Sequence, residues 1–209
     1  MSAAESRRAN GARLDLRVVA GLVQPGTRVL DVGCGDGALL ELLAREKRVD
    51  GRGIELSQAG VHASVARGLS VIQGDADTDL ADFPDGAFDH VILSQTLQAV
   101  RNPREVLLHM LRIGGQAIVS FPNFGAWRAR FYMLTRGRMP VGEVLGEAWY
   151  ATPSIHPCSI ADFLDLCREL DVAIEHGVAL GRDGSEEPVG DGRRANLRAE
   201  LAIFALRRR

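Results

Sequence analysis

The chain has 209 residues, a hydrophobic fraction of 46% and a formal net charge of −2. That length fits one domain with a sizeable core, and the charge argues against a surface devoted to nucleic acid. No apolar run approaches the roughly 20 residues of a membrane helix, and segment 1–13 has no apolar signal core, so we expect a cytoplasmic protein without membrane contact. The cysteines Cys34, Cys158 and Cys167 stand at no metal-ligand spacing, which predicts free thiols and no metal site.

Apolar spacing and turn residues predict alternating strands and helices through the first 121 residues. A helix is expected over 13–23, and the N-caps Asp36, Ser57 and Asn102 predict three more. The expected strands cover residues 28–32, 51–56, 69–73, 88–93 and 116–121. Short buried strands separated by helices indicate a parallel sheet covered on both faces, which binds ligands at the carboxyl ends of its strands.

Residues 122–158 interrupt this alternation with four prolines, both tryptophans and both tyrosines. We expect a helix at about 124–135 inside a lid-like insertion at about 122–158, within a single domain of residues 1–209. A packing flap without ligand contact is the alternative.

The end of the chain predicts a return to regular structure. Ser159 is expected to cap a helix that ends near 170. A strand over 172–180, a mobile loop over 181–196 and a strand over 198–206 then predict an antiparallel hairpin at one edge of the sheet. The expected fold is therefore α/β: a doubly wound, Rossmann-like, mostly parallel sheet of seven strands with an antiparallel C-terminal hairpin.

The segment 29–40, VLDVGCGDGALL, places a glycine-rich turn after the first strand, and read loosely it fits the dinucleotide-binding pattern. Asp31 precedes this turn and Asp36 lies within it, so two carboxylates would oppose a pyrophosphate. S-adenosylmethionine has no phosphate and carries a cationic sulfonium and ammonium. The pattern therefore favours S-adenosylmethionine, or its product S-adenosylhomocysteine, over a dinucleotide oxidoreductase cofactor.

Two further acids follow the next strands. Glu55 ends the second strand, where a carboxylate can accept from both ribose hydroxyls, and Asp75 follows the third, where it can accept from the adenine amino group. Because the strands are predicted to be parallel, Asp31, Glu55 and Asp75 should share one edge of the sheet.

These motifs resemble the class I S-adenosylmethionine-dependent methyltransferases, and more closely the methionine biosynthesis protein MetW family. The resemblance covers most of residues 28–167, with Ser70, Ser154 and Pro157 as small departures. It rests on the stretches LDVGCGDG, QGDA, DGAFDHVILSQTLQAV, SFPNFGAWR, RGRMP and WYATPSIH.

The resemblance implies a set of cofactor contacts. Leu56 would pack on the adenine or ribose, while Arg13 would reach the methionine carboxylate or stand as a surface arginine. Cys34 is expected to fill space in the turn rather than act as a nucleophile. The implied cofactor-binding residues are Asp31, Gly33, Cys34, Gly35, Glu55, Leu56, Asp75, Ala76, Ser94 and Gln95.

Methyl transfer needs positioning, and a base where the acceptor carries a proton. The loop after the fourth strand, SQTLQ, is neutral, and the glutamine Gln98 cannot be a base. His156 and Tyr150 are the titratable candidates for catalysis, with a histidine bonded to backbone as the alternative for His156. The expected contacts to a substrate or partner are Gln98, Asn123, Trp127, Tyr150 and His156.

Two functions follow from this interpretation. The first is a small-molecule methyltransferase of methionine biosynthesis whose insertion forms the acceptor pocket. The second is a non-catalytic, S-adenosylmethionine-sensing partner or activator of homoserine O-acyltransferase, an association that the MetW resemblance implies. In that case exposed aromatic and arginine residues within 122–150 would form the protein contact.

Overall fold

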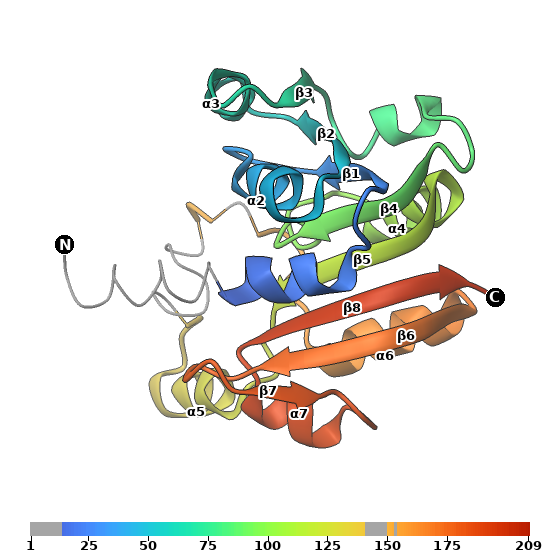
Figure 1. Cartoon of the computed structure of the whole chain (residues 1–209). Coiled ribbons are helices and arrows are strands. Elements are labelled where there is room, and N and C mark those ends of the chain that lie inside the picture. Colours follow the sequence, from blue (N-terminus) through green and yellow to red (C-terminus); the bar gives the residue numbers. More distant parts are fainter. Residues whose placement is uncertain (1–13, 141–149, 153) are drawn as a thin grey trace.

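One mixed sheet with helices on both faces organises the chain (Figure 1). The computed structural model describes residues 14–140, 150–152 and 154–209, of which 14–22 form a first helix. The remaining elements are β1 (Arg28–Val32), α2 (Ala38–Lys47), β2 (Asp50–Glu55), α3 (Gln58–Ala66), β3 (Ser70–Gln73), η1 (Asp79–Asp82), β4 (Phe88–Ser94), α4 (Pro103–Ile113), β5 (Gly114–Pro122), α5 (Trp127–Arg136), α6 (Ile160–Glu169), β6 (Val172–Leu180), β7 (Glu186–Pro188), α7 (Arg193–Arg198) and β8 (Leu201–Arg208).

The strand order is β3-β2-β1-β4-β5-β8-β6-β7. β1 pairs in parallel with both β2 and β4, and β8 pairs antiparallel with β5 and β6. The chain runs outward from β1 to β3 and then returns to β4 on the other side of β1, which makes a topological switch point between β1 and β4. The doubly wound α/β fold is confirmed, and the glycine turn after β1 lies at that switch point.

Two expectations for the C-terminal part are wrong, while the antiparallel pairing of β6 with β8 is confirmed. The sheet has eight strands rather than seven, and residues 181–196 are not a mobile loop, because they contain β7 and the start of α7. β8 lies between β5 and β6, and the additional strand β7 pairs with β6 and forms the edge. The segment looked polar, but Val189 and Ala195 are buried against the core and hold it in place.

Two apolar clusters fix the sheet between its helices. On one face, α4 and α6 pack through residues such as Met110 and Phe163. On the other, helix 14–22 and α2 pack through residues such as Val19 and Leu43 (Figure 1). The strands therefore have helices on both faces, as their continuous apolar runs predict, and their carboxyl ends have fixed positions.

The helix starts test the predicted caps. The Ser57 hydroxyl accepts from Gly60 N, and Ser159 forms a capping box with Asp162, so both N-caps are confirmed. Asp36 is not the N-cap of α2, because Gly37 occupies that position with a φ of 78°. Asp36 instead accepts from Ala38 N at 3.2 Å and pairs with Arg67 at 2.6 Å.

No helix within the described ranges is both long and apolar enough to cross a membrane. Among those same residues, no group of three or more His, Cys, Asp or Glu side chains could hold a metal ion.

Candidate cofactor site

The turn after β1 ties three strands together. Gly33 has a φ of 70°, and a Cβ on it would lie 2.6 Å from Thr96 Cγ2, so only glycine lets this turn approach the end of β4. Gly33 N and Cys34 N both donate to Ile54 O of β2, at 2.8 and 3.3 Å. The turn is therefore held between β2 and β4.

Glu55 connects this turn to the next one. Its Oε2 accepts from Gly35 N and its Oε1 accepts from Ser57 N, each at 2.8 Å. The half-buried carboxylate is thereby fixed at the end of β2, and each oxygen has a further lone pair for a ligand hydroxyl. This position suits the predicted ribose contact.

Asp31 carries one of three buried side-chain oxygens in the described residues that lack a hydrogen-bond partner, the others being Gln98 Oε1 and Asn196 Oδ1. Asp31 is 1% exposed, and its Oδ1 is the unbonded atom. Burial, and then the charge of Glu55, raise its pKa to about 8. A buried polar atom without a partner is costly and calls for an explanation such as a ligand. The unbonded oxygen of Asp31 fits a cationic ligand, which favours the ionised carboxylate, whereas a pyrophosphate would oppose that ionisation.

The carboxylate of Asp36 adds little negative potential at the site, because it faces α3 and pairs with Arg67. The case against a dinucleotide therefore rests on Asp31 rather than on Asp31 and Asp36, because dinucleotide-binding folds also carry an acid at the position of Glu55.

Cys34 is buried in the turn, 8% exposed, and burial raises the pKa of its thiol to about 12. A thiol with that pKa carries almost no thiolate near neutral pH, so it cannot serve as a nucleophile. A Cβ on Gly53 would lie 2.6 Å from the Cys34 sulfur, which shows that the side chain fills space against β2.

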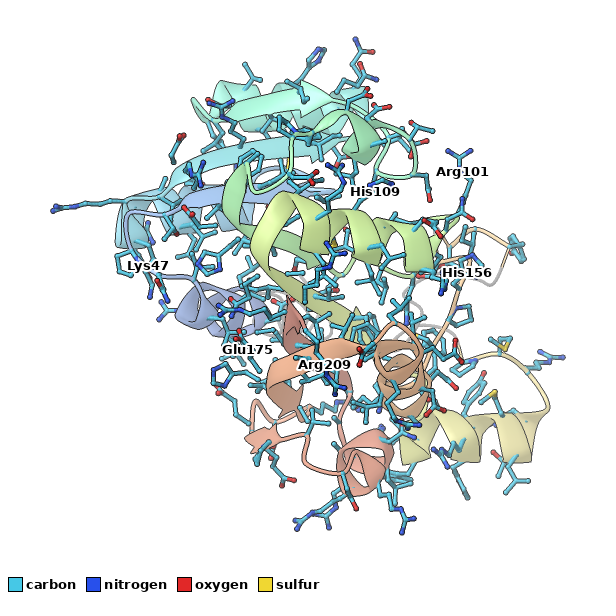
Figure 2. The ribbon with its side chains drawn as sticks, turned by 90° about the vertical axis from the view of Figure 1, so that its right-hand side faces the viewer. Lys47, Arg101, His109, His156, Glu175 and Arg209 are labelled. Carbon is cyan, nitrogen blue, oxygen red and sulfur yellow. The ribbon has the colours of Figure 1, made fainter. Side chains whose placement is uncertain are left out.

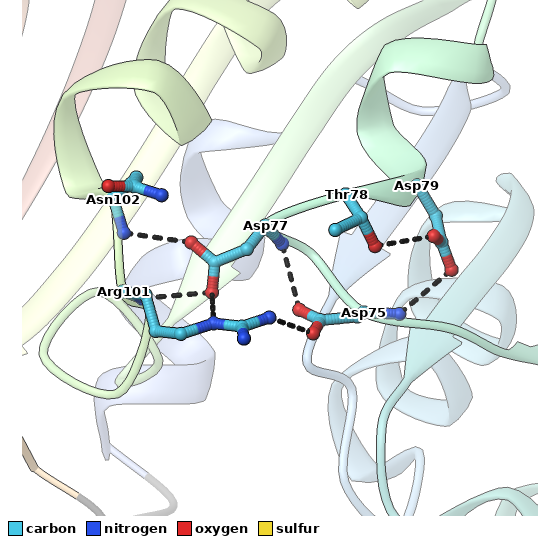
Figure 3. Close-up of polar contacts among 6 residues, drawn as sticks. All are labelled: Asp75, Asp77, Thr78, Asp79, Arg101 and Asn102. Carbon is cyan, nitrogen blue, oxygen red and sulfur yellow. Dashed lines mark hydrogen bonds and ion pairs between the residues drawn. The ribbon is translucent and has the colours of Figure 1, made fainter.

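Asp75, the predicted adenine contact, belongs to a bonded cluster (Figure 3). Its Oδ1 accepts from Asp77 N at 2.9 Å, and its Oδ2 pairs with the Arg101 guanidinium. Asp77 in turn accepts from Arg101 N at 2.9 Å and from Asn102 N at 2.8 Å. Burial acts to raise the pKa of Asp77, but these hydrogen bonds outweigh it and leave the pKa lowered.

The cluster explains the start of α4. Asn102 holds the N-cap position, as predicted, with Pro103 next, yet its side chain makes no capping hydrogen bond. Asp77 instead accepts from the backbone of Arg101 and of Asn102 itself, so the turn after β3 is attached to the segment that leads into α4. Sequence reasoning missed both Asp77 and Arg101.

The end of β4 carries a second buried acid. Gln95 is exposed, has a φ of 53° unusual for a non-glycine residue, and is held by its N donating to Ser120 O at 2.9 Å. Its side-chain amide donates to Asp15, which is 2% exposed. Burial raises the pKa of Asp15, against a smaller opposing effect of the Gln95 hydrogen bond. Ser94 lies beside it, with its Oγ 3.2 Å from Ser120 Oγ.

His156 adopts the backbone-bonded arrangement. Its Nε2 lies 3.1 Å from Arg101 O, and because that oxygen is an acceptor, Nε2 carries the proton. Ile155 N and His156 N also donate to Gln98 O, at 2.7 and 3.0 Å. Arg101 and His156 lie on the same side of the molecule (Figure 2). The ring is exposed, and its bonded nitrogen serves the loop after β4.

Two predicted substrate or partner contacts lie inside the fold. Gln98 is 2% exposed and donates to Pro122 O at 2.9 Å. Asn123 is 1% exposed; its Nδ2 donates to two backbone carbonyls, and its Oδ1 accepts from Gly125 N and Ile160 N. Asn123 therefore holds the junction of β5 with α6 and α7, while Gln98 ties the loop after β4 to β5 and keeps its Oε1 without a partner.

The other candidates are open to solvent. Leu56 is 65% exposed beside Glu55, Trp127 is 50% exposed on α5, and Tyr150 is 78% exposed. Ala76 is half-buried beside Asp75. Arg13 lies outside the described residues. The fold therefore brings the predicted cofactor contacts to the carboxyl ends of β1 to β4, and leaves Trp127 and Tyr150 in the insertion.

Fold and site together define a protein of the class I methyltransferase fold. A family model described as methionine biosynthesis protein MetW matches residues 13–206. The chain belongs to the MetW family. It is 38% identical, over 93% of its length, to the bifunctional methionine biosynthesis protein MetXA/MetW of Rhodopirellula baltica, and it spans 33% of that longer protein.

Solved structures share the fold at low identity. An S-adenosylmethionine-dependent methyltransferase from Thermotoga maritima matches with a TM-score of 0.65 and 19% identity, over 93% of this chain and 87% of its own. The [4+2]-cyclase SpnF matches with a TM-score of 0.65 and 20% identity, over 92% of this chain and 80% of its own. Because a protein described as a cyclase shares the fold, the fold alone does not assign methyl transfer.

Proposed function

We propose that this protein binds S-adenosylmethionine, or S-adenosylhomocysteine, at the carboxyl ends of β1 to β4 and thereby regulates a homoserine O-acyltransferase of methionine biosynthesis. The observation that carries the binding site is the orphaned, buried Oδ1 of Asp31 beside Glu55. Support for the partner comes from the relative that unites MetXA and MetW in one chain.

Each residue has one expected role. Asp31 would hold the cationic methionine end, Glu55 the ribose hydroxyls, and Asp75 with the Ala76 backbone the adenine. Leu56, 65% exposed, offers apolar surface for the adenine or ribose. When bound, S-adenosylmethionine supplies an activated methyl group.

The surroundings of the residues first considered for catalysis fit a regulatory role better than methyl transfer. His156 donates its Nε2 proton to a backbone carbonyl, and Gln98 is buried and bonded to Pro122. Both side chains hold the loop after β4. Gln98 has no basic atom, and in His156 only Nδ1 is left to accept a proton.

A chain of contacts supports sensing. Arg101 pairs with Asp75 through its guanidinium and accepts from His156 through its carbonyl. An adenine amino group bound to Asp75 would share or displace the Arg101 contact. The change would pass to His156 and so to the end of the insertion, which is how a ligand can shift one conformation against another.

Two measurements on the purified proteins test this function. Calorimetry should show S-adenosylmethionine or S-adenosylhomocysteine binding with a micromolar or lower dissociation constant. The activity of the homoserine O-acyltransferase from the same source should change at least about fivefold on addition of this protein, and the change should depend on S-adenosylmethionine. Absence of binding removes the site; an acyltransferase indifferent to this protein removes the partner.

Small-molecule methyl transfer is the second candidate, and Asp15 favours it. This carboxyl is buried against Gln95, one of the expected cofactor contacts; its Oδ1 accepts from Leu16 N at 2.8 Å, its Oδ2 accepts from the Gln95 amide, and burial raises its pKa. Here we expect S-adenosylhomocysteine to form when the protein is incubated with S-adenosylmethionine and candidate acceptors.

Under this second function, Asp15→Asn should lower that turnover about 100-fold or more with little change in cofactor affinity. His156→Ala should have the smaller effect, since its Nε2 is bonded to Arg101 O. Full activity in Asp15→Asn removes Asp15 from the mechanism, and full loss in His156→Ala restores the histidine as the base.

A further inference from the structure

The helix α5 turns an apolar stripe toward solvent. Trp127, Phe131 and Leu134 are 50%, 59% and 84% exposed. They stand at positions i, i+4 and i+7, which share one face of a helix. Figure 1 shows α5 at the end of the molecule, outside the two helix layers that cover the sheet. Exposed apolar side chains that lie side by side in this way indicate an interaction site, whereas single exposed apolar residues are common on any surface.

The anchoring of α5 is slight. Ala129 is the residue of this helix that is buried, and the N-cap Ala126 makes no side-chain hydrogen bond. Arg130 Nε donates to Gly125 O at 2.5 Å and ties the first turn to the loop before it. Ten residues form a marginal helix in water, because most helix stability in proteins comes from packing an apolar face. The face that would supply this packing is the one left open.

The charge of the segment indicates what could cover it. Residues 123–140 contain four arginines and no Asp or Glu, in a chain whose formal net charge is −2. The Arg128 guanidinium lies 5.8 Å from the centre of the Trp127 ring. Tryptophan, phenylalanine, methionine and arginine are the residues enriched at protein interfaces, whereas lysine is depleted there. A complementary surface is an apolar groove with carboxylates on its rim.

We propose that α5 is the docking helix for the homoserine O-acyltransferase, entering an apolar groove with an acidic rim by its Trp127, Phe131 and Leu134 face. This inference rests on the proposed function and adds to it the surface and its chemistry. The mode is the insertion of an amphipathic helix into a groove, with a few aromatic and aliphatic anchors supplying most of the affinity.

The test compares an acid placed on the stripe with the same acid placed elsewhere. Leu134→Glu and Phe131→Glu put a charge on the stripe, facing the acidic rim. Val65→Glu is the matched control, because Val65 is an apolar side chain, 53% exposed, on α3. Binding to the purified acyltransferase is measured by calorimetry, and S-adenosylmethionine binding is measured in every variant as the check of fold and site.

We expect Leu134→Glu and Phe131→Glu each to weaken the complex about 30-fold or more, while Val65→Glu binds like the wild type. All variants should keep the cofactor affinity of the wild type. The wild-type complex should also weaken as salt is raised, because charged groups form its rim.

The contrary outcomes are distinct. If the wild-type protein and the acyltransferase do not associate, the partner in the proposed function fails and the docking helix fails with it. If they associate and the stripe variants bind equally well, the docking helix alone is wrong. A wild-type dimer that Leu134→Glu dissociates, or binding to vesicles with anionic headgroups that it abolishes, overturns the proposal in favour of a second copy or a membrane surface.

Discussion

Glu55→Ala is expected to lower the affinity for S-adenosylmethionine at least about 100-fold. The carboxylate fixes two turns by accepting from Gly35 N and Ser57 N, and it is the expected acceptor for the ribose hydroxyls. Hydrogen bonds to a charged group contribute about 1.5–3 kcal/mol each, so loss of two at the ligand already accounts for ~3 kcal/mol. Calorimetry with both S-adenosylmethionine and S-adenosylhomocysteine measures the change.

A matched control separates this site from general loss of negative charge. Glu41 lies on α2, pairs with Arg67 at 2.6 Å and makes no part of the proposed ligand contacts. Glu41→Ala should therefore keep the wild-type affinity. If Glu55→Ala also binds the cofactor normally, the ribose subsite lies elsewhere and the assignment of the β2 acid is wrong.

The strands could be predicted because each carries its own signal. Short apolar runs bounded by turns located β1 to β5, and β6 has the expected bounds of 172–180. Parallel pairing then places Asp31, Glu55 and Asp75 at one edge, since the carboxyl ends of parallel strands meet there. The strand order itself follows from packing and pairing across the whole chain, and this is why the short edge strand β7 was not predicted.

The missed residues depend on contacts between distant parts of the chain. Arg101 meets an acid 26 residues earlier, and Asp15 meets an amide 80 residues later. Neither sequence position carries a motif of its own. Asp36 misled for a related reason: its place inside the glycine turn suggested a charge that would oppose a pyrophosphate, but its side chain pairs with Arg67 of α3's C-cap.

The insertion shows where sequence reasoning about a site reaches its limit. SFPNFGAWR located the functional segment by resemblance, and Asn123 within it proved to be buried and fully bonded. Trp127, four residues further on, is half exposed. Only the packing of α6 and α7 against the end of β5 separates a structural amide from an exposed aromatic ring.

Asp31→Asn is expected to stabilise the free protein while it destroys the binding site. The carboxyl is buried with an unbonded oxygen, and burial together with Glu55 raises its pKa to about 8. Since the unfolded chain has the ordinary value near 3.9, the folded state retains a proton that the unfolded state releases between about pH 4 and pH 8. The stability of the wild type therefore falls as pH rises through that window, and the amide is exempt from this loss.

Thermal unfolding without ligand should show Asp31→Asn melting about 5 °C or more above the wild type at pH 8. This difference in melting temperature should become smaller as the pH is lowered toward 5. Asp183→Asn is the control, because Asp183 is an exposed aspartate bonded to Ser185 whose pKa is lowered, so its curve should run parallel to the wild type from pH 6 to 8. Equal melting of Asp31→Asn and wild type at pH 8 would contradict a carboxyl held against its ionised form.

Cofactor binding should move in the opposite direction. A cationic ligand favours the ionised carboxylate, so wild-type affinity should rise with pH, by up to about tenfold per unit, until the pKa near 8 is passed. Asp31→Asn should bind weakly, without that rise. If the variant gains stability and loses the pH-dependent affinity, Asp31 lowers the stability of the free protein and its ionised carboxylate binds the ligand. If the gain in stability leaves affinity intact, the orphaned oxygen belongs to the fold alone.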